Sequence, residues 1–133
     1  MEVTEVDERF LIRFEYRPEY LALVARFHGL LTFQDLLQIA PQVHGHPNFP
    51  DVRGVLFDMR AARTGHDPKE LRRFVDLLAE RREPRGYRAA YLVEDDFAFG
   101  MTRMFDALAE GLHDRARMIF REERAAFAWL SAT

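Results

Sequence analysis

The stretch of sequence that decides the fold is Val52-Arg53-Gly54-Val55-Leu56-Phe57-Asp58-Met59-Arg60. Its apolar residues stand side by side instead of alternating with polar ones, which predicts a strand over residues 53–58 that is covered on both faces. In open α/β sheets, ligands and partners usually meet the protein at the carboxyl ends of such strands. Asp58 and Arg60 follow there, and the stretch has no Ser, Cys or His that could act as a nucleophile. It therefore indicates an architecture more strongly than an activity.

Composition sets the class of protein. The chain has 133 residues, of which 48% are hydrophobic and 12 are Phe, so we expect one folded domain over residues 1–133. The 19 basic and 22 acidic residues give a formal net charge of -3, which argues against a nucleic-acid partner. The chain has no Cys, which excludes disulfides and thiol chemistry. An acidic N-terminus and the lack of a long apolar run predict a soluble cytoplasmic protein with no integral membrane segment.

The N-terminal third predicts a hairpin followed by a helix. Phe10–Tyr16 alternates apolar and polar residues, as a half-buried edge strand does, and Tyr20–Phe27 reads as a second, apolar strand. The short turn between them predicts antiparallel pairing, and Gly29 is expected to close the second strand. Thr32 then has the features of a helix N-cap, and Pro41 is expected to end or kink the helix that follows.

The remaining chain alternates helices and strands. Asp67-Pro68 begins a helix, because Asp caps helices well and Pro suits the first helical position. The predicted apolar stripe of that helix is Leu71, Phe74, Val75 and Leu78. Further elements are a strand at Tyr87–Val93, a helix capped by Asp95 or Asp96, a strand at Arg115–Phe120 and a helix at Glu122–Leu130.

This order, β-β-α-β-α-β-α-β-α, defines an α/β fold. Strands linked through helices are expected to run parallel with right-handed crossovers, while the N-terminal strand pairs antiparallel. The prediction is therefore a single domain with a mixed five-stranded sheet.

Four segments resemble the SpoIIAA-like family, which is related to STAS domains. They are Gly29-Leu30-Leu31-Thr32, the stretch Gly54–Arg60, Asp96-Phe97-Ala98-Phe99-Gly100-Met101-Thr102-Arg103-Met104-Phe105, and Ile119–Leu130. The resemblance spans nearly the whole chain, but each segment is mostly structural. It implies a βα superhelix with helices along a mixed sheet.

The resemblance also implies a non-enzymatic role. STAS domains proper do no catalysis, and several antagonise anti-sigma factors through a Ser that lies two residues after a strand-ending Asp. In this chain Asp58 matches that Asp, but Arg60 stands where the Ser would be. Arg cannot be phosphorylated, so the phosphoswitch is absent at this position. Thr64 is the nearest hydroxyl, and it lies too far along to be equivalent.

One candidate site consists of charged residues. In an extended segment, Asp58 and Arg60 project from the same side, and Arg recognises carboxylates and phosphates with two parallel hydrogen bonds. A polar anchor for a ligand or partner is therefore one hypothesis, with Arg103 joining from the next strand–helix unit and Thr64 on the same surface. The alternative is structural: Asp58 caps the turn at residues 60–63 and Arg60 pairs with a nearby carboxylate.

A second candidate site is apolar. Five residues crowd the start of the helix after the fourth strand, namely Phe97, Phe99, Met101, Met104 and Phe105. Because Phe97 and Phe99 precede the regular stripe of that helix, they are candidates to line a pocket for a lipid-like or aromatic ligand. The alternative is ordinary core packing, since apolar residues at helical spacing usually face the core.

Catalytic and metal sites lack a supporting pattern. Ser131 is the only Ser, which excludes a serine triad. His44 and His46 lie close together in a loop, but Asp51 and His66 would join them only if separate loops converged. We therefore expect no catalytic residues, no metal and no cofactor.

Two functions remain from this reasoning. The first is a non-enzymatic regulatory module that binds a protein partner, and the alternative is a carrier or sensor of a small apolar ligand. The high aromatic content also makes a homodimer a hypothesis.

Overall fold

The structure is a computed structural model that describes residues 9–64, 67–80, 86–109 and 116–132. Its strands are β1 (Leu11–Arg17), β2 (Ala22–Leu31), β3 (Gly54–Thr64), β4 (Arg88–Leu92) and β5 (Arg117–Phe120). Its helices are α1 (Phe33–His44), α2 (Pro68–Ala79), α3 (Asp96–Leu108) and α4 (Glu123–Ser131). Short 3₁₀ helices at Pro18–Tyr20 and Phe49–Asp51 precede β2 and β3.

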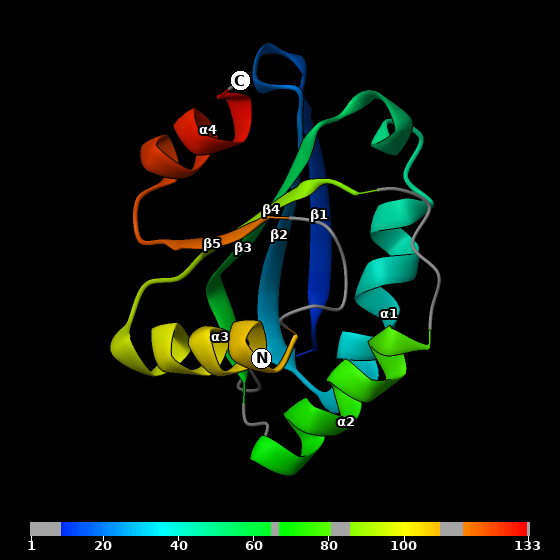
Figure 1. Cartoon of the computed structure of the whole chain (residues 1–133), viewed down its shortest axis with the longest axis vertical. Helices are drawn as coiled ribbons and strands as arrows, with labels where there is room; N and C mark the ends of the chain where they lie inside the picture. The colour runs from blue at the N-terminus through cyan, green and yellow to red at the C-terminus, as the bar shows by residue number, and fades with distance from the viewer. Residues whose placement is uncertain (1–8, 65–66, 81–85, 110–115, 133) are drawn as a thin grey trace, which may run out of the picture.

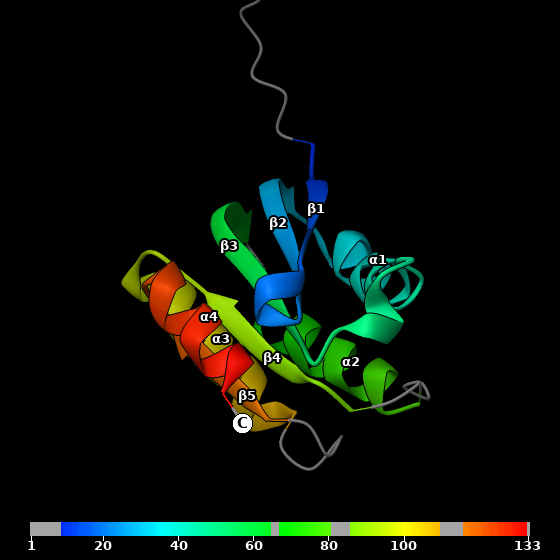
Figure 2. The same cartoon turned by 90° about the horizontal axis from the view of Figure 1, so that it is seen from above.

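Across the described residues, the strands form one sheet in chain order (Figure 1). β1 runs antiparallel to β2, while β2, β3, β4 and β5 are parallel to one another. The predicted element order and the mixed five-stranded sheet are thus confirmed. Figure 2 shows α4 on one side of the sheet and α1 on the other, with α2 beside α1.

The central strands are buried on both faces, as the apolar run at residues 55–57 predicts. Leu23 and Val55 share a cluster with α1, and the neighbouring Val24 and Leu56 share a second cluster with α4. Both clusters exclude water from the strands between them, which explains why these strands read as continuous apolar runs. Within and just before β1, one face holds Phe10, Ile12, Phe14 and Tyr16 as predicted, and these residues pack on the α1 side.

Side-chain caps fix the starts of three helices. Thr32 accepts a hydrogen bond from the Asp35 amide, and the Asp35 carboxylate accepts one from the Thr32 amide. Asp67 and Glu70 form the same reciprocal pair at α2. At α3 the cap is Asp95, one of the two residues predicted. These caps satisfy amide groups that the first helical turn leaves without backbone partners.

Two predicted breaks do not occur. Gly29 does not close the second strand: it lies within β2 at φ 99°, a conformation that Gly adopts without strain, and the strand continues to Leu31. Pro41 does not end the first helix either, because α1 continues to His44. Val43 in that last turn is fully buried, so tertiary packing maintains the helix past the Pro.

β3 is longer than the predicted strand at 53–58 and contains a bulge. Arg26 of β2 pairs with Asp58, but His28 pairs with Ala61, so β3 carries one extra residue across this interval. Asp58 and Arg60 therefore lie inside the strand, which continues to Thr64. The expectation that Asp58 ends the strand and that Arg60 follows it is wrong.

The end of α4 is fixed by a basic residue of β4. Arg88 donates hydrogen bonds of 2.7 Å to the carbonyl oxygens of Trp129 and Ala132, and its guanidinium lies 5.6 Å from the Trp129 ring centroid. A cation here complements the negative end of the helix dipole. α4 therefore remains on the face of the sheet opposite α1.

Two Gly→Ala substitutions should have opposite effects. A Cβ at Gly54 would lie 2.5 Å from Leu130 Cδ2 and 3.1 Å from the Arg88 carbonyl oxygen, whereas one at Gly100, within α3, meets nothing within 4 Å. We expect Gly54→Ala to lower the free energy of unfolding by about 1–3 kcal/mol through overpacking. Gly100→Ala should raise it by about 0.5–1 kcal/mol, because Ala favours the helix. Urea unfolding checks both, and equal stability of the two variants would contradict the close approach at Gly54.

Candidate functional site

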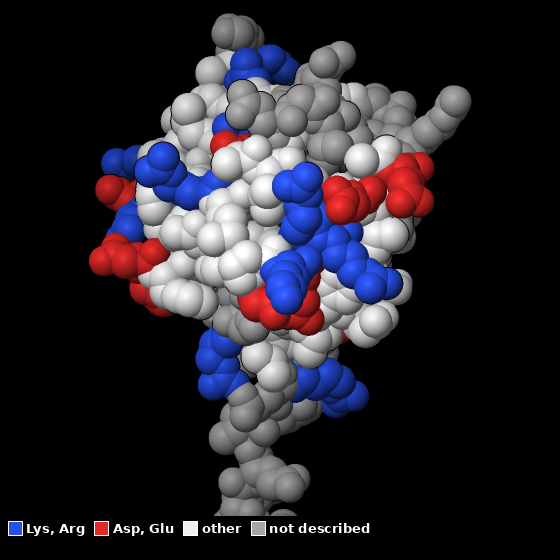
Figure 3. All heavy atoms as spheres, turned by 60° about the horizontal axis from the view of Figure 1, so that its bottom comes forward, with Lys and Arg blue, Asp and Glu red and all other residues white. Residues whose placement is uncertain are grey.

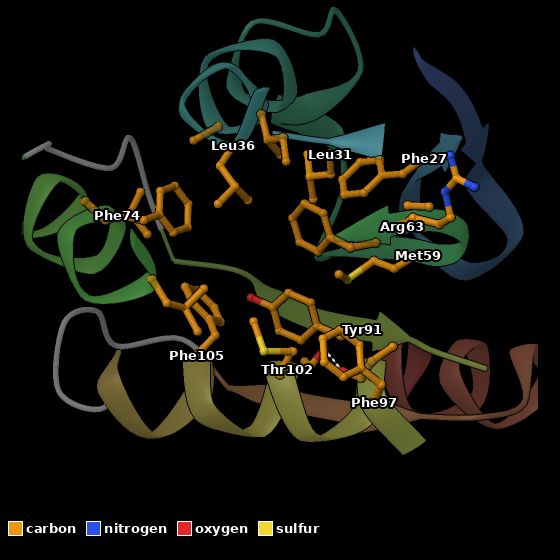
Figure 4. Close-up of a pocket in the computed structure, with 18 of the residues that line it drawn as sticks. Phe27, Leu31, Leu36, Met59, Arg63, Phe74, Tyr91, Phe97, Thr102 and Phe105 are labelled. Carbon is orange, nitrogen blue, oxygen red and sulfur yellow. Dashed lines mark hydrogen bonds between the residues drawn. The ribbon is translucent and has the colours of Figure 1, made fainter. Parts of the chain in front are cut away.

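A cavity of about 360 Å³ lies between the sheet and helices α1, α2 and α3 (Figure 4). Strands β2, β3 and β4 supply one wall, where Phe27, Phe57 and Tyr91 line the space. The helices supply the rest, including Leu36 of α1 and Phe74 of α2. Apart from Arg63, Asp95, Thr102, Tyr87 and Tyr91, all the lining side chains are apolar.

The cavity exists because the apolar stripe of α2 is not pressed against the strands. Leu71, Phe74 and Leu78 are shielded from solvent as predicted, but each of them lines the cavity. α2 packs instead beside α1 and α3, as Figure 1 shows. The residues that the sequence predicts as core thus form the walls of an internal space.

A series of aromatic rings, each in contact with the next, extends across the cavity. Successive ring centroids are 5.3 Å apart for Phe10–Phe27, 6.2 Å for Phe27–Phe57, 5.3 Å for Phe57–Tyr91, 6.0 Å for Tyr91–Phe105 and 5.8 Å for Phe105–Phe74. We call this series the aromatic belt. It begins on the β1 side and ends on α2, and all its rings except that of Phe10 line the cavity.

Several polar groups of the walls bond to the protein itself. The Asp95 carboxylate accepts a hydrogen bond of 2.7 Å from the Ala98 amide, and the Thr102 hydroxyl donates one of 2.8 Å to the Ala98 carbonyl oxygen. The Tyr87 hydroxyl lies 3.4 Å from His44 Nε2. Arg63 stands at the edge of the site, with its guanidinium directed away from the centre (Figure 4). The interior is therefore suited to apolar contact.

The five apolar candidate residues divide into two groups. Phe97, Met101 and Phe105 line the cavity, and Phe97 is also 62% exposed. Phe99 instead lies under Arg121, whose guanidinium is 5.0 Å from the ring centroid, and Met104 is 38% exposed. Phe99 and Met104 are therefore not part of the cavity lining, and ligand binding by the other three stays a prediction.

Asp58 and Arg60 belong to an ion network on the α4 side of the sheet. Asp58 is only 6% exposed and accepts hydrogen bonds from Arg26 at 2.7 Å and from Arg60 Nε at 2.9 Å. Glu123 of α4 accepts hydrogen bonds from both Arg residues, at 2.9 and 3.1 Å. Glu15 of β1 accepts another from Arg26, at 2.7 Å. The network thus links β1, β2, β3 and α4.

Asp58 and Arg60 share one face because residues two apart in a strand project from the same side. The Arg60 amide donates a hydrogen bond of 3.2 Å to Asp58 Oδ1, which satisfies backbone at the irregular position. The predicted pairing of Arg60 with a nearby carboxylate is confirmed, but the predicted turn is a strand. Arg103 does not join this group, because it is exposed on α3, the helix that borders the cavity.

The network alters the pKa of its members. Burial raises the pKa of Asp58, but hydrogen bonds from Arg60 and Arg26 outweigh burial and hold it below its ordinary value. The hydrogen bond from Arg26 likewise lowers the pKa of Glu15, and Glu15 in turn raises the pKa of Arg26. The charged forms are therefore the stable ones, as expected for a structural ion network.

Other predicted positions have local roles or lie outside the described part. His46 Nδ1 accepts a hydrogen bond of 3.1 Å from the Asn48 amide, and His44 faces Tyr87. Thr64 is the last residue of β3, but its side chain and the whole of His66 lie outside the described residues. Within the described ranges, no three His, Asp or Glu residues are placed to hold a metal ion.

Sequence reasoning missed both the ion network and the full extent of the cavity. A signal for the network was present: Arg26 and Asp58 are opposite charges within otherwise apolar strands. Their register pairs them directly, and buried charges occur almost only in pairs. The cavity walls carried no comparable signal, because a lining Phe and a packed Phe look alike in sequence.

One face of the molecule is unevenly charged. Figure 3 turns the lower end of the molecule in Figure 1 toward the viewer, and it shows an uncharged area in the middle of this face. Basic and acidic side chains gather on both sides of this area.

In the part of the chain that the structure describes, no helix is long and apolar enough to cross a membrane.

Comparison with known structures confirms the predicted fold. The chain is similar to an uncharacterized DUF3478 family protein with a SpoIIAA-like fold from Shewanella loihica PV-4. The two share 17% identity at a TM-score of 0.57, over 97% of this chain and 99% of that chain. No model of a known family matches the sequence, and no curated protein does. The chain therefore has a SpoIIAA-like fold, and at this identity the likeness extends to the fold alone.

Removing the Asp58 carboxylate should destabilise the protein. We expect Asp58→Asn to lower the free energy of unfolding by about 2–3 kcal/mol at pH 6, because buried hydrogen bonds to Arg26 and Arg60 lose their charged acceptor. Since the pKa of Asp58 is lowered by folding, its contribution is complete above the unfolded pKa of about 3.9 and disappears as the pH falls through the lower folded pKa. The gap between wild type and variant should therefore narrow below about pH 4.

A matched control comes from an exposed ion pair on α2. Arg72 and Asp76 lie 3.6 Å apart with 66% and 65% of their side chains exposed. Asp76→Asn should change stability by less than about 0.5 kcal/mol. Urea unfolding from pH 3 to pH 6 measures both variants. An Asp58→Asn protein as stable as the Asp76→Asn protein would show that the network contributes nothing.

Proposed function

We propose that this protein is a non-enzymatic binding module that holds a small apolar ligand in the cavity between the sheet and helices α1, α2 and α3. The observation that carries the proposal is the apolar lining of a cavity of about 360 Å³. An apolar cavity of about 150 Å³ is enough to bind benzene. Ligand pockets in general begin at about 300 Å³.

The chemistry of the walls supports binding over turnover. A catalytic centre needs a nucleophile, or an acid and a base, placed to reach the bound molecule. Here the Asp95 carboxylate and the Thr102 hydroxyl are hydrogen-bonded to the backbone of their own helix. Both groups serve to stabilise α3, which is why we favour a carrier or sensor over an enzyme.

A regulatory role through a protein partner is the second candidate, and one observation favours it. Phe97 both lines the cavity and exposes 62% of its surface, so a ligand inside and a partner outside would contact the same ring. Met104 and Arg103 are exposed on the same helix. In this proposal, a partner would bind at the mouth and respond to occupancy of the cavity.

Filling the cavity should abolish ligand binding. Ala62 of β3 lines the cavity, so Ala62→Phe places a ring in the space that the ligand would occupy. Ala125 is exposed on α4, on the other face of the sheet, and Ala125→Phe is the matched control. With N-phenyl-1-naphthylamine as the fluorescent probe, we expect wild type and Ala125→Phe to bind alike and Ala62→Phe to bind at least about tenfold more weakly.

A thermal melt of each variant and native mass spectrometry complete this test. Ala62→Phe must melt cooperatively for its loss of binding to count. A copurified apolar molecule that leaves on denaturation would support a carrier. Equal probe binding by wild type and Ala62→Phe would contradict the cavity as the site, and the absence of binding to wild type would contradict the proposed function.

A further inference from the structure

We infer that the cavity selects a planar, uncharged aromatic ligand of about two or three fused rings in preference to a flexible acyl chain of equal size. This inference rests on the proposed function and names the class of ligand. It follows from the aromatic belt, from the volume of the cavity and from the position of the charged groups.

The aromatic belt gives the cavity a rigid wall. Phe57 and Tyr91 are neighbours in the β3–β4 register, and their rings are nearly parallel, 16° apart, with centroids at 5.3 Å. Phe105 and Phe74 continue the wall onto the helices. Each ring is supported by the next, so the wall cannot adapt to a flexible chain as readily as a wall of Met or Leu would.

The direction of the rings favours contact with an aromatic face. Side chains stand roughly perpendicular to a sheet, so Phe57 and Tyr91 extend from their strands toward the helices. Figure 4 shows Tyr91 extending into the site, with its hydroxyl on the side of Phe105. The C–H edges of aromatic rings carry partial positive charge and ring faces partial negative charge. Edges that point into a cavity therefore attract the face of a planar aromatic ligand.

The size of the cavity and the position of its charged residues narrow the class of ligand further. The volume of about 360 Å³ is more than twice the volume of about 150 Å³ that accommodates one benzene ring. The charged lining residues are Arg63 and Asp95, of which Asp95 caps α3 and Arg63 points away from the centre. The other polar lining groups are the neutral hydroxyls of Tyr87, Tyr91 and Thr102. An uncharged ligand fits these walls best, because moving a charge from water into mostly apolar surroundings is costly.

Two ligands with the same carbon skeleton test the preference. 2-Naphthol is planar and aromatic, while decahydro-2-naphthol is saturated and puckered, and each carries a single hydroxyl. Titration calorimetry on the full chain measures both dissociation constants. We expect 2-naphthol to bind about tenfold more tightly, because only the planar ligand offers a face to the ring edges. In Phe57→Leu the ratio should fall close to one.

Two further variants test whether the preference for 2-naphthol depends on the aromatic belt. Phe127 is buried on the α4 side of the sheet, so Phe127→Leu removes a ring of the core while leaving the aromatic belt intact and should retain the preference. If Phe57→Leu fails to fold, Phe105→Leu on α3 removes another ring of the belt and should reduce the ratio in the same way.

The outcomes separate this inference from the proposed function. Equal or tighter binding of decahydro-2-naphthol to wild type would overturn the aromatic preference and leave the ligand-binding function intact. 1-Decanol is a further test ligand. If it bound more tightly than its greater hydrophobicity explains, the site would be one for acyl chains, and the aromatic preference would again be overturned. If N-phenyl-1-naphthylamine and all three alcohols fail to bind, the proposed function fails as well.

Discussion

The structure depends on the division of side chains between the two faces of the central strands. In β2 and β3, alternate residues point toward α1 or toward α4, and both directions are sealed from water. The bulge between Asp58 and Ala61 changes this alternation within β3. Asp58 and Arg60, two residues apart, join the ion network on one face. Met59 and Ala62 both line the cavity on the other face although they are three residues apart, which the extra residue makes possible.

The two faces achieve stability in different ways. On the α4 side, Val24, Leu56 and Leu130 are fully buried, and the ion network lies on the same side of the sheet. On the other side, three helices meet one another around an internal space, and the large rings of the belt form its walls. The side of the sheet with fewer direct helix contacts is therefore the side that has room for a ligand.

Sequence patterns were sufficient for the features that depend on local residues. Capping by Thr32 and Asp67, the stripe of α2 and the order of the elements follow from neighbouring side chains, and all were predicted. The length of β3 was not, because a bulge depends on how two strands pair. Of the cavity lining, only Phe97, Met101 and Phe105 belong to the predicted apolar group. Phe97, Met101 and Phe105 are spaced by four residues and so share a face of α3, whereas Phe99 does not share it.

The position of the only tryptophan has a practical consequence. Trp129 lies on α4, next to Phe120 and beneath the Arg88 guanidinium, and the sheet separates it from the cavity. Its fluorescence emission should therefore report whether α4 is packed on the sheet, and it should not change when a ligand binds in the cavity. Intrinsic fluorescence and an added dye would then report independently on the two halves of the molecule. A change in Trp129 emission on binding of a ligand that does not absorb this emission would reveal a conformational coupling between the two faces of the sheet.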